Sequence, residues 1–272
     1  MSHPAINVAV QAAHNAGEIM RRQLHRVDSI PVALKARHDY VSEVDKACEA
    51  EIVREISRFY PDHAFLGEEG GARGDSEIVW IIDPLDGTSN FLHGIPHFAV
   101  SISQQVKGRT EHAVVHDPMR DETYTASRGG GAFLNNQRLR VSKRTSLKGA
   151  IVGTGFPFRD RQYSRVHQNI LSRLWNEIED IRRVGTASLD LAYVAAGRFD
   201  GFFEIGLKAW DVSAGALLVR EAGGVVCDFL GGDNVEDAGT IIAAPYKLIT
   251  PMRRIIEPRW SSFEHDRVNA PG

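Results

Sequence analysis

The residues best suited to chemistry stand in one short segment, residues 83–89, with the sequence DPLDGTS. The hydrophobic run Trp80–Ile82 precedes it, so Asp83 stands at the end of a predicted strand. Pro84 turns the chain, and we expect the carboxylates of Asp83 and Asp86 to lie on one side of a tight loop. Neighbouring carboxylates repel one another unless a cation neutralises them, and oxygen-rich sites of this kind suit magnesium. The alternative is that both acids only cap a turn, since Asp-Pro and Asp-Gly are common turn dipeptides.

The residues after this acid pair predict a place for an anion. Gly87, Thr88 and Ser89 are expected to open a short helix. The first backbone N–H groups of a helix lack partners inside it, and they lie at its positive end. A metal site and an anion site within one segment together indicate a site that handles phosphate.

Further acids could join this site, although each has an ordinary structural interpretation. Glu68 and Glu69 stand among glycines that leave room for ions, but adjacent glutamates usually face solvent. Asp45 stands near the start of a predicted helix, where it could simply interact with the helix dipole. Asp211 follows Trp210 at another helix start, where it could be an ordinary N-cap. Their joint occurrence favours the functional interpretation.

The elements that must position these residues change character near residue 145. Apolar residues recur at three- and four-residue steps over 6–24 and 44–56, which predicts two helices. Short strand-like runs then follow at hairpin spacing and predict an antiparallel sheet beside those helices. The predicted strands are Ala64–Gly67, Ile78–Asp83, Phe98–Val106, Glu111–His116, Thr123–Ala126 and Ala132–Leu134.

Strands alternate with helices in the second part, which is typical of an α/β layer. We therefore expect an N-terminal α+β half, 1–145, that carries the antiparallel sheet and the metal loop, and a C-terminal α/β half, 146–272, that completes the active site. Residues 259–272 are expected to form a mobile tail. The predicted strands are 150–154, 181–184, 201–204, 225–228 and 240–243, and the predicted helices are 163–177, 187–196, 210–222 and 245–257.

The composition excludes several classes of protein. The 272 residues suffice for one large or two closely packed domains. Lys and Arg number 32 against 35 Asp and Glu, and this net charge of −3 argues against nucleic-acid binding by bulk charge. No apolar run approaches the roughly 18 residues of a membrane span, no secretory signal is visible, and Cys48 and Cys227 form no metal or redox motif. We expect a cytoplasmic protein.

Three motifs taken together resemble the inositol monophosphatase family of magnesium-dependent, lithium-sensitive phosphatases. They are GEE at 67–69, DPLDGT at 83–88 and WDVSAG at 210–215. The stretches 154–158, 189–198 and 201–206 look like its bacterial SuhB-type branch, and the similarity spans nearly the whole chain. The resemblance implies an α+β fold, the layered α-β-α-β-α sandwich of the inositol monophosphatase and fructose-bisphosphatase type.

The resemblance also implies a role for each acid. Two magnesium ions would be held, and a weaker third ion would lie near Glu68. Glu68 and Thr88 would orient the attacking water, with Asp45 holding the Thr88 hydroxyl, and no covalent phosphoenzyme is needed. The implied metal ligands are Glu68, Asp83, the Leu85 carbonyl, Asp86 and Asp211.

Recognition of the substrate is implied for residues of both halves. Glu204 matches the acid that accepts a hydrogen bond from an inositol hydroxyl, although it could equally be a strand-end charge facing water. His93 and His97 flank the metal loop and are interpreted as loop residues rather than ligands. The implied substrate-binding residues are Gly87, Thr88, Gly185, Thr186, Ala187, Glu204 and Asp211.

The implied reaction is hydrolysis of inositol 1-phosphate and related monoesters to myo-inositol and phosphate. Phosphatases of phosphoadenosine phosphate or fructose bisphosphate are the alternative, but they generally carry larger insertions than this chain has. The SuhB-type branch is also associated with ribosomal-RNA antitermination through Nus factors and RNA polymerase, so a mainly non-catalytic transcription role is a further alternative. Candidate surfaces for it are Arg138–Arg144 and the Arg182-Arg183 pair. Family members often form homodimers, which this chain does not decide.

Overall fold

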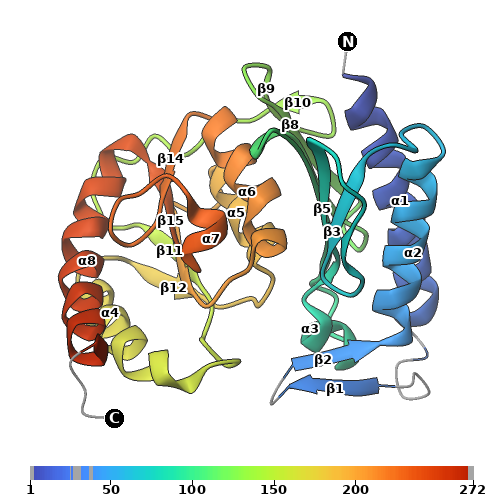
Figure 1. Ribbon diagram of the computed structural model, residues 1–272. Coiled ribbons are helices and arrows are strands. Elements are labelled where there is room, and N and C mark those ends of the chain that lie inside the picture. The colour runs from blue at the N-terminus through green and yellow to red at the C-terminus, as the bar shows by residue number, and fades with distance from the viewer. Residues whose placement is uncertain (1–2, 25, 27–31, 37–38, 269–272) are drawn as a thin grey trace.

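The structure is a computed structural model that describes residues 3–24, 26, 32–36 and 39–268. Its elements stack in five layers, seen edge-on in Figure 1: two helices, a large sheet, two central helices, a smaller sheet and two more helices. Three hydrophobic clusters form the core: one under the first helix pair, one around the central helices between the two sheets, and one under the last helix pair. The predicted α+β fold with α-β-α-β-α layers is confirmed.

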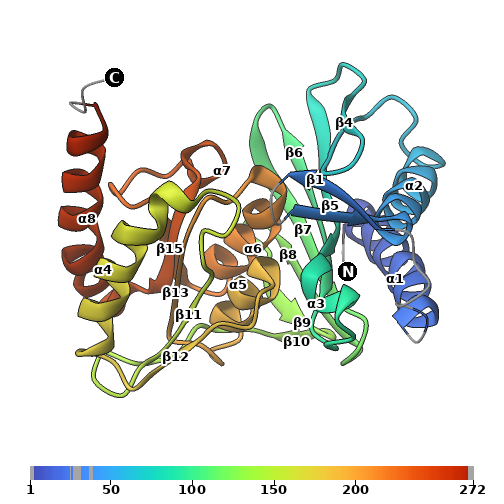
Figure 2. The same ribbon diagram turned by 90° about the horizontal axis from the view of Figure 1, so that it is seen from below.

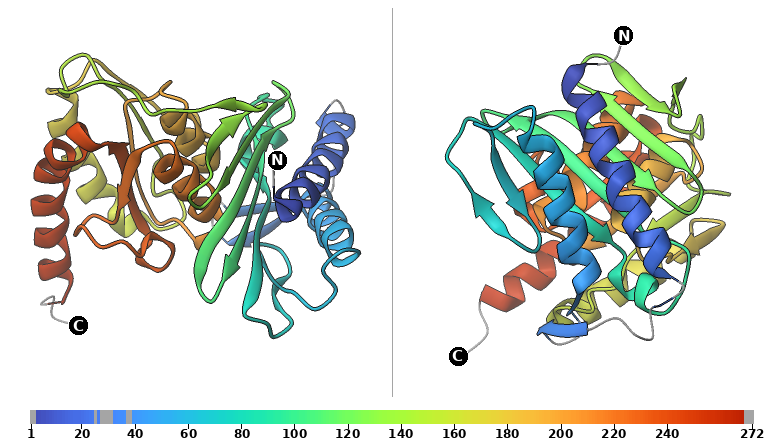
Figure 3. Two further views of the ribbon diagram at one scale, coloured as in Figure 1. Left: turned by 90° about the horizontal axis from the view of Figure 1, so that it is seen from above. Right: turned by 90° about the vertical axis from the view of Figure 1, so that its right-hand side faces the viewer.

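The first layer consists of α1 (Pro4–Leu24) and α2 (Glu43–Ser57), both predicted from their apolar stripes. Figure 3 shows them side by side across the outer face of the large sheet. The buried stripe of α1 is rich in alanine, which lets its backbone approach α2 and the sheet closely. Ser42 caps α2: its hydroxyl accepts the N–H groups of Val44 and Asp45, and the Asp45 carboxylate accepts the N–H of Ser42.

The large sheet is antiparallel except at one pair of strands, β3 and β5, which run parallel. The prediction of an antiparallel sheet is therefore wrong for that pair, because the β3–β4 hairpin makes the chain re-enter on the other side of β3. Gly67, the last residue of β3, pairs with Ile82, so Glu68 follows β3 beside Asp83 near the end of β5. The strands in spatial order are β10 (Gln137–Arg138), β9 (Gly131–Leu134), β8 (Glu122–Ser127), β7 (Arg109–Asp117), β6 (Ala99–Val106), β5 (Ile78–Asp86), β3 (Ala64–Gly67) and β4 (Gly71–Arg73).

A separate two-stranded pair, β1 (Val32–Ala36) and β2 (Asp39–Ser42), precedes α2. It was not predicted from the sequence. Figure 2 shows this pair close to α3 (Thr88–Leu92), the short helix that follows the DPLDG segment.

The central helices are α5 (Ala187–Ala195) and α6 (Ala209–Glu221). Every residue of α5 is buried, and α6 is buried from Asp211 to Val219. A helix covered by sheets on both sides must be apolar or small all round. That requirement explains the alanine-rich sequences of these two helices. The few acids buried in them are exceptions to it.

The smaller sheet is mixed, because β11 runs parallel to both of its neighbours while β15 runs antiparallel to both of its own. Its outer face is covered by α4 (Ser164–Trp175) and α8 (Tyr246–Val268), which lie side by side in Figure 2. The strands in spatial order are β12 (Asp180–Arg182), β11 (Ile151–Thr154), β13 (Gly201–Ile205), β15 (Thr240–Pro245) and β14 (Gly224–Cys227).

The last helix extends well past its predicted end at residue 257. It continues to Val268, so the expected mobile tail is helical over 259–268, and the rest of that tail, 269–272, lies outside the described residues. Pro258 removes one helical hydrogen bond, which is why the sequence favoured an end there. Trp260, only 8% exposed, packs against Phe229, Tyr163 and Phe263, and this burial keeps the helix going.

Candidate active site

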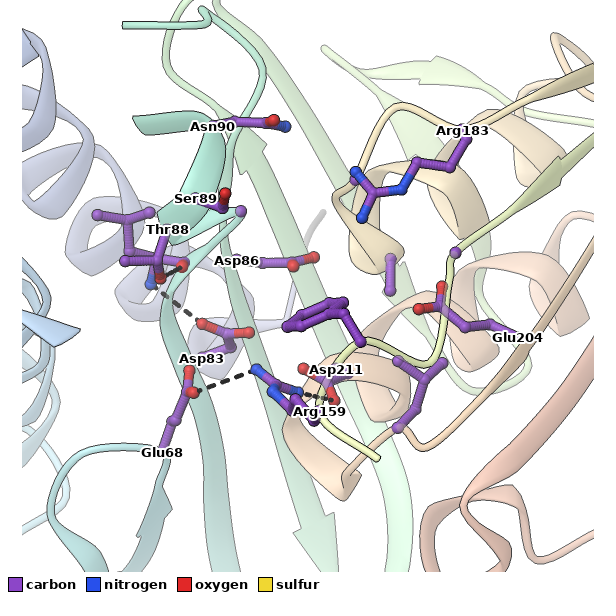
Figure 4. A pocket seen from close by; sticks show the side chains of 17 residues that line it. Glu68, Asp83, Asp86, Thr88, Ser89, Asn90, Arg159, Arg183, Glu204 and Asp211 are labelled. Carbon is purple, nitrogen blue, oxygen red and sulfur yellow. Dashed lines mark hydrogen bonds and ion pairs between the residues drawn. The ribbon is translucent and has the colours of Figure 1, made fainter. Parts of the chain in front are cut away.

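Three buried aspartates from two distant parts of the chain meet at one point. Asp83 and Asp86 lie at the end of β5, and Asp211 lies in the first turn of α6. One carboxylate oxygen of each lies within 4.8 Å of the others. Figure 4 shows their carboxylates converging on the same cleft, which is also lined by Glu68 and Glu204.

Each of these aspartates is held by a backbone N–H group. Asp83 Oδ1 accepts from the N–H of Leu85 at 3.1 Å, and Asp86 Oδ2 accepts from that of Ser188 in α5 at 2.7 Å. Asp211 Oδ2 accepts from the N–H of Lys208, also at 2.7 Å, as part of the cap of α6. A carboxylate fixed through one oxygen can present its other oxygen to a cation without losing its orientation.

The buried carboxylates of this cluster favour the binding of a positive charge. Burial, followed by the neighbouring charges of Glu68, Asp86 and Asp211, raises the pKa of Asp83 well above its ordinary value. Burial also raises the pKa of Asp86 to about 6, against hydrogen bonds from Ser188 that lower it. Acids gathered this closely without a cation retain protons, so a bound cation would compensate a real cost. The donors are all oxygen atoms, which fits a hard divalent ion such as magnesium.

Glu68 reaches the cleft from the turn after β3, and α2 holds that turn through a residue not predicted from the sequence. The carboxylate of Glu49, only 3% exposed, accepts the backbone N–H of Glu69 at 2.8 Å. A Cβ atom on Gly67 or Gly70 would collide with this carboxylate, so both glycines are needed for its approach. The sequence around Glu49 predicts only a helix with an apolar face, so it does not indicate that the Glu49 carboxylate binds the turn after β3.

A second unpredicted residue, Arg159, lies among the acids. Its Nη2 is 3.7 Å from Glu68 Oε1, and its Nη1 is 3.7 Å from Asp211 Oδ2. It stands on the loop between β11 and the 3₁₀ turn Arg161–Tyr163, next to a segment quoted above only for its resemblance. Figure 4 shows the guanidinium bridging the two carboxylates.

Thr88 and Asp45, expected to act together, are in contact. The Thr88 hydroxyl lies 2.9 Å from Asp45 Oδ1 and 3.1 Å from the carbonyl oxygen of Leu85, and it can donate to either. Burial raises the pKa of Asp45, while hydrogen bonds from Ser42 and Thr88 lower it. The capping role that was the alternative for Asp45 is also present, because its second oxygen caps α2.

The segment expected to bind an anion, residues 87–89, comes directly after Asp86 in the chain. Gly87 has a φ of 98°, and a Cβ atom there would lie 2.6 Å from the Thr186 hydroxyl and 3.2 Å from the carbonyl of His97. Thr186 is itself buried and donates to that same carbonyl at 3.1 Å, while Gly185 and Ala187 line the cleft. Of the three loop residues predicted to bind substrate, Gly185 and Ala187 therefore line the cleft, whereas Thr186 is buried and holds the loop to the backbone of His97.

Glu204 lies in β13 at the far side of the cleft, buried to 8% exposure and not at a solvent-facing strand end. Gly155 packs directly against its carboxylate. Burial, then Asp211 and Asp86, raise its pKa to about 8. Arg183 also lines the cleft and opposes this shift, with its guanidinium 5.8 Å from the ring centroid of Phe156.

The two histidines near the metal loop lie outside the acid cluster. His93 is exposed, and its Nδ1 lies 2.8 Å from the carbonyl of Ser89. His97 is buried, with Nδ1 3.4 Å from Arg120, and its backbone carbonyl accepts from Asn90 and Thr186. Their positions agree with their interpretation as loop residues.

A family model described as the inositol monophosphatase family matches residues 1–262. The chain belongs to that family. The family consists of metal-dependent phosphatases, which agrees with the acid cluster.

Individual relatives support this membership. The Nus factor SuhB of Pseudomonas aeruginosa is 53% identical over 261 residues, which cover 94% of this chain and 96% of that protein. The solved structure of extragenic suppressor protein suhB from Bartonella henselae has a TM-score of 0.91 and 44% identity, covering 94% of this chain and 99% of that one. The structure of Thermotoga maritima IMPase has a TM-score of 0.86 and 32% identity, covering 94% and 98%. Among the described residues, no helix is both long and apolar enough to span a membrane.

Proposed function

We propose that this phosphatase hydrolyses inositol 1-phosphate and related monoesters with magnesium as its cofactor. The observation that carries the proposal is the meeting of Asp83, Asp86 and Asp211 within 4.8 Å beside Glu68, at the start of α3. Membership of the inositol monophosphatase family supports the substrate class.

Magnesium fits the donor set, with Glu68, Asp83, the Leu85 carbonyl, Asp86 and Asp211 as the residues that would hold it. When bound, it would supply the positive charge that activates a water molecule and stabilises the leaving oxygen. We expect lithium to inhibit the reaction, because the family is lithium-sensitive.

The chain's own residues then position the water and the phosphate. A Thr88 hydroxyl that donates to Asp45 Oδ1 has its lone pairs available to accept a hydrogen bond from water. Asp45, buried and already tied to Ser42, keeps that hydroxyl in one orientation. The N–H groups of Gly87 and Thr88 would donate hydrogen bonds to phosphate oxygens, because the start of a helix favours negative charge.

Glu204 and Arg183 would read the alcohol part of the substrate. A few well-placed polar groups suffice to recognise a neutral polyol, and these two line the cleft together with Gly185 and Ala187. A phosphatase of phosphoadenosine phosphate or fructose bisphosphate remains the competing proposal, since it uses the same metal-binding acids.

Steady-state kinetics with magnesium test this function. We expect turnover of inositol 1-phosphate to exceed that of phosphoadenosine phosphate and fructose bisphosphate, and we expect lithium to inhibit it. Thr88→Ala should lower kcat about a hundredfold, the range of one positioned proton-handling group, while Thr88→Ser should restore most of it. A strong preference for the nucleotide or the bisphosphate would transfer the assignment to that substrate.

We also propose a role in transcription antitermination, because the Pseudomonas relative is named a Nus factor at 53% identity. The site acids are separate from the basic loop, whose Arg144 pairs with Asp200, and from Arg182, which pairs with Asp180. Arg183, the other member of that candidate surface, lines the cleft instead. Asp83→Asn should therefore abolish phosphatase activity and leave binding to purified Nus factors and RNA polymerase intact. Loss of both together would argue against separate functions.

A further inference from the structure

The loop that carries Arg159 places a positive charge inside the acid cluster. Of the cleft-lining residues that the structure describes, the cationic ones are Arg159 and Arg183. Arg183 lies over Phe156, towards Glu204, whereas Arg159 lies between Glu68 and Asp211 (Figure 4). Arg159 is therefore the side chain that partly neutralises the carboxylates of the metal site.

The positive charge of Arg159 favours the ionised form of the acids around it. Arg159 opposes the pKa increase of Asp83 and also that of Asp86 and Glu204. A guanidinium is always charged and presents a planar fork of donors, which suits two carboxylates at once. It supplies one positive charge where the implied divalent ion would supply two.

The geometry of these ion pairs is loose. Both separations are 3.7 Å, longer than a hydrogen bond, and the side chain is 33% exposed. The guanidinium also lies 5.4 Å from the ring centroid of Phe158, itself 38% exposed on the same loop. Each of these two contacts is therefore weaker than an ion pair with a direct hydrogen bond.

A second cavity gives the side chain another place to go. Arg159 also lines a neighbouring pocket whose wall carries Asp160, Asp228 and Glu264. Glu264 already pairs with Arg267 on the same wall, so Asp160 and Asp228 are the carboxylates there that a displaced guanidinium can approach.

We propose that Arg159 is a built-in counter-cation of the metal site, which competes with divalent ions for Glu68 and Asp211. The inference rests on the proposed metal site. It concerns the affinity of that site for metal and the stability of the metal-free protein, and it requires no knowledge of the substrate. Because its positive charge repels a divalent ion bound beside these two ligands, it lowers metal affinity and stabilises the metal-free state.

Manganese binding to the full chain, followed by electron paramagnetic resonance, tests the inference without an activity assay. We expect Arg159→Ala and the bulkier neutral Arg159→Gln to bind Mn²⁺ about three- to tenfold more tightly, the range of one or two partly exposed charge contacts. Arg159→Lys, which keeps the charge, should bind as the wild type does. The matched control is Arg165→Ala, which removes the same charge from the exposed surface of α4.

Thermal melting in a chelating agent provides the second measurement. Both neutral variants should melt below the wild type without metal and gain more from added Mn²⁺ than it does. Unchanged or weakened Mn²⁺ affinity in both neutral variants would overturn the inference while leaving the proposed function intact. A wild-type protein that binds no Mn²⁺ would overturn the proposed function, and this inference with it.

Discussion

At the level of single residues, the acids of this site have structural and chemical roles at the same time. For three of these acids the structural alternative is also true: Asp83 accepts the N–H of the turn at Leu85, Asp211 takes part in the cap of α6, and Asp45 in that of α2. A carboxylate has two oxygens, so one can hold the backbone while the other serves the cleft. Local interpretations of these residues therefore could not exclude the functional one.

Asp83→Asn separates the two roles. The asparagine oxygen can still accept the Leu85 N–H, so the turn should survive. We expect phosphatase activity with magnesium to fall at least about a hundredfold, because the implied metal loses a charged ligand. In a chelating agent the variant should melt higher than the wild type by about 2–4 °C for each kcal/mol of relieved repulsion.

The measurements are steady-state turnover of inositol 1-phosphate and differential scanning calorimetry. Asp75→Asn, an exposed position, is the control and should change neither. A lower melting temperature for metal-free Asp83→Asn would contradict the view that the buried carboxylates repel one another there.

At the level of elements, the site depends on where strands and helices end. The parallel pairing of β3 and β5 brings Glu68 beside Asp83, and the hydrogen bond from Ser188 to Asp86 ties the start of α5 to the end of β5. Asn90 adds a further link, donating to the carbonyls of His97 and Val184. Spacing alone cannot reveal the contacts of Ser188 with Asp86 and of Asn90 with Val184, because each joins segments about a hundred residues apart.

Gly87→Ala tests the tight junction at residues 87–89, the segment expected to bind an anion. Its positive φ and the approach of Thr186 both oppose a Cβ atom, so we expect a loss of unfolding free energy of about 2–3 kcal/mol and a marked loss of activity. Gly94→Ala is a matched control: it has a φ of 68° but open space around its Cβ position. It should cost only about 1–2 kcal/mol and keep activity. Urea unfolding and kinetics measure both, and equal losses would argue against crowding at Gly87.

Trp260→Ala tests why the last helix passes its prolines. Removal of this buried ring should lower the unfolding free energy by about 3–5 kcal/mol, as for other large core side chains. Trp175, 61% exposed at the end of α4, provides the control, and Trp175→Ala should cost little. Chemical denaturation measures both variants, and a small effect at Trp260 would mean that the helix end is held by something else.

Much of the architecture could be predicted from the sequence, and the reasons for the gaps are physical. Apolar periodicity locates α1 and α2 because one face of each is buried. The predicted end of the last helix at residue 257 is wrong, because the tertiary packing of Trp260 outweighs the tendency of Pro258 to end a helix. Glu49 and Arg159 were missed because their partners, the Glu69 N–H and the Asp211 carboxylate, come close only in the folded chain.

At the level of the whole molecule, the cleft joins both parts of the chain. The large sheet contributes Glu68, Asp83 and Asp86, while α6 and the smaller sheet contribute Asp211 and Glu204. Negative charge from both sides therefore meets at the junction, and the stability of the metal-free protein should depend on pH through this junction.

Glu204 provides the clearest pH effect, since its folded pKa of about 8 lies well above its ordinary value of 4.5. Between these pH values the unfolded chain releases the proton first, so the metal-free protein loses stability as pH rises. His116 and His167, with pKa values lowered to about 4 by burial, act in the opposite direction, but only up to their ordinary value of 6.5. The carboxyl effect should therefore dominate from about pH 6.5 to 8.

Urea unfolding in a chelating agent across pH 6–9 measures this dependence. We expect the unfolding free energy of the wild type to fall over pH 6.5–8 and that of Glu204→Gln to fall less steeply. Glutamine does not titrate, whereas Asp83 and the buried Asp190 of α5, whose pKa values are also raised by burial, still do. Added magnesium should flatten the wild-type curve, since a cation compensates the charge that the deprotonated acids bring to the cleft. The same slope in Glu204→Gln and the wild type would mean that the junction of the two sheets does not control the acid–base behaviour of the molecule.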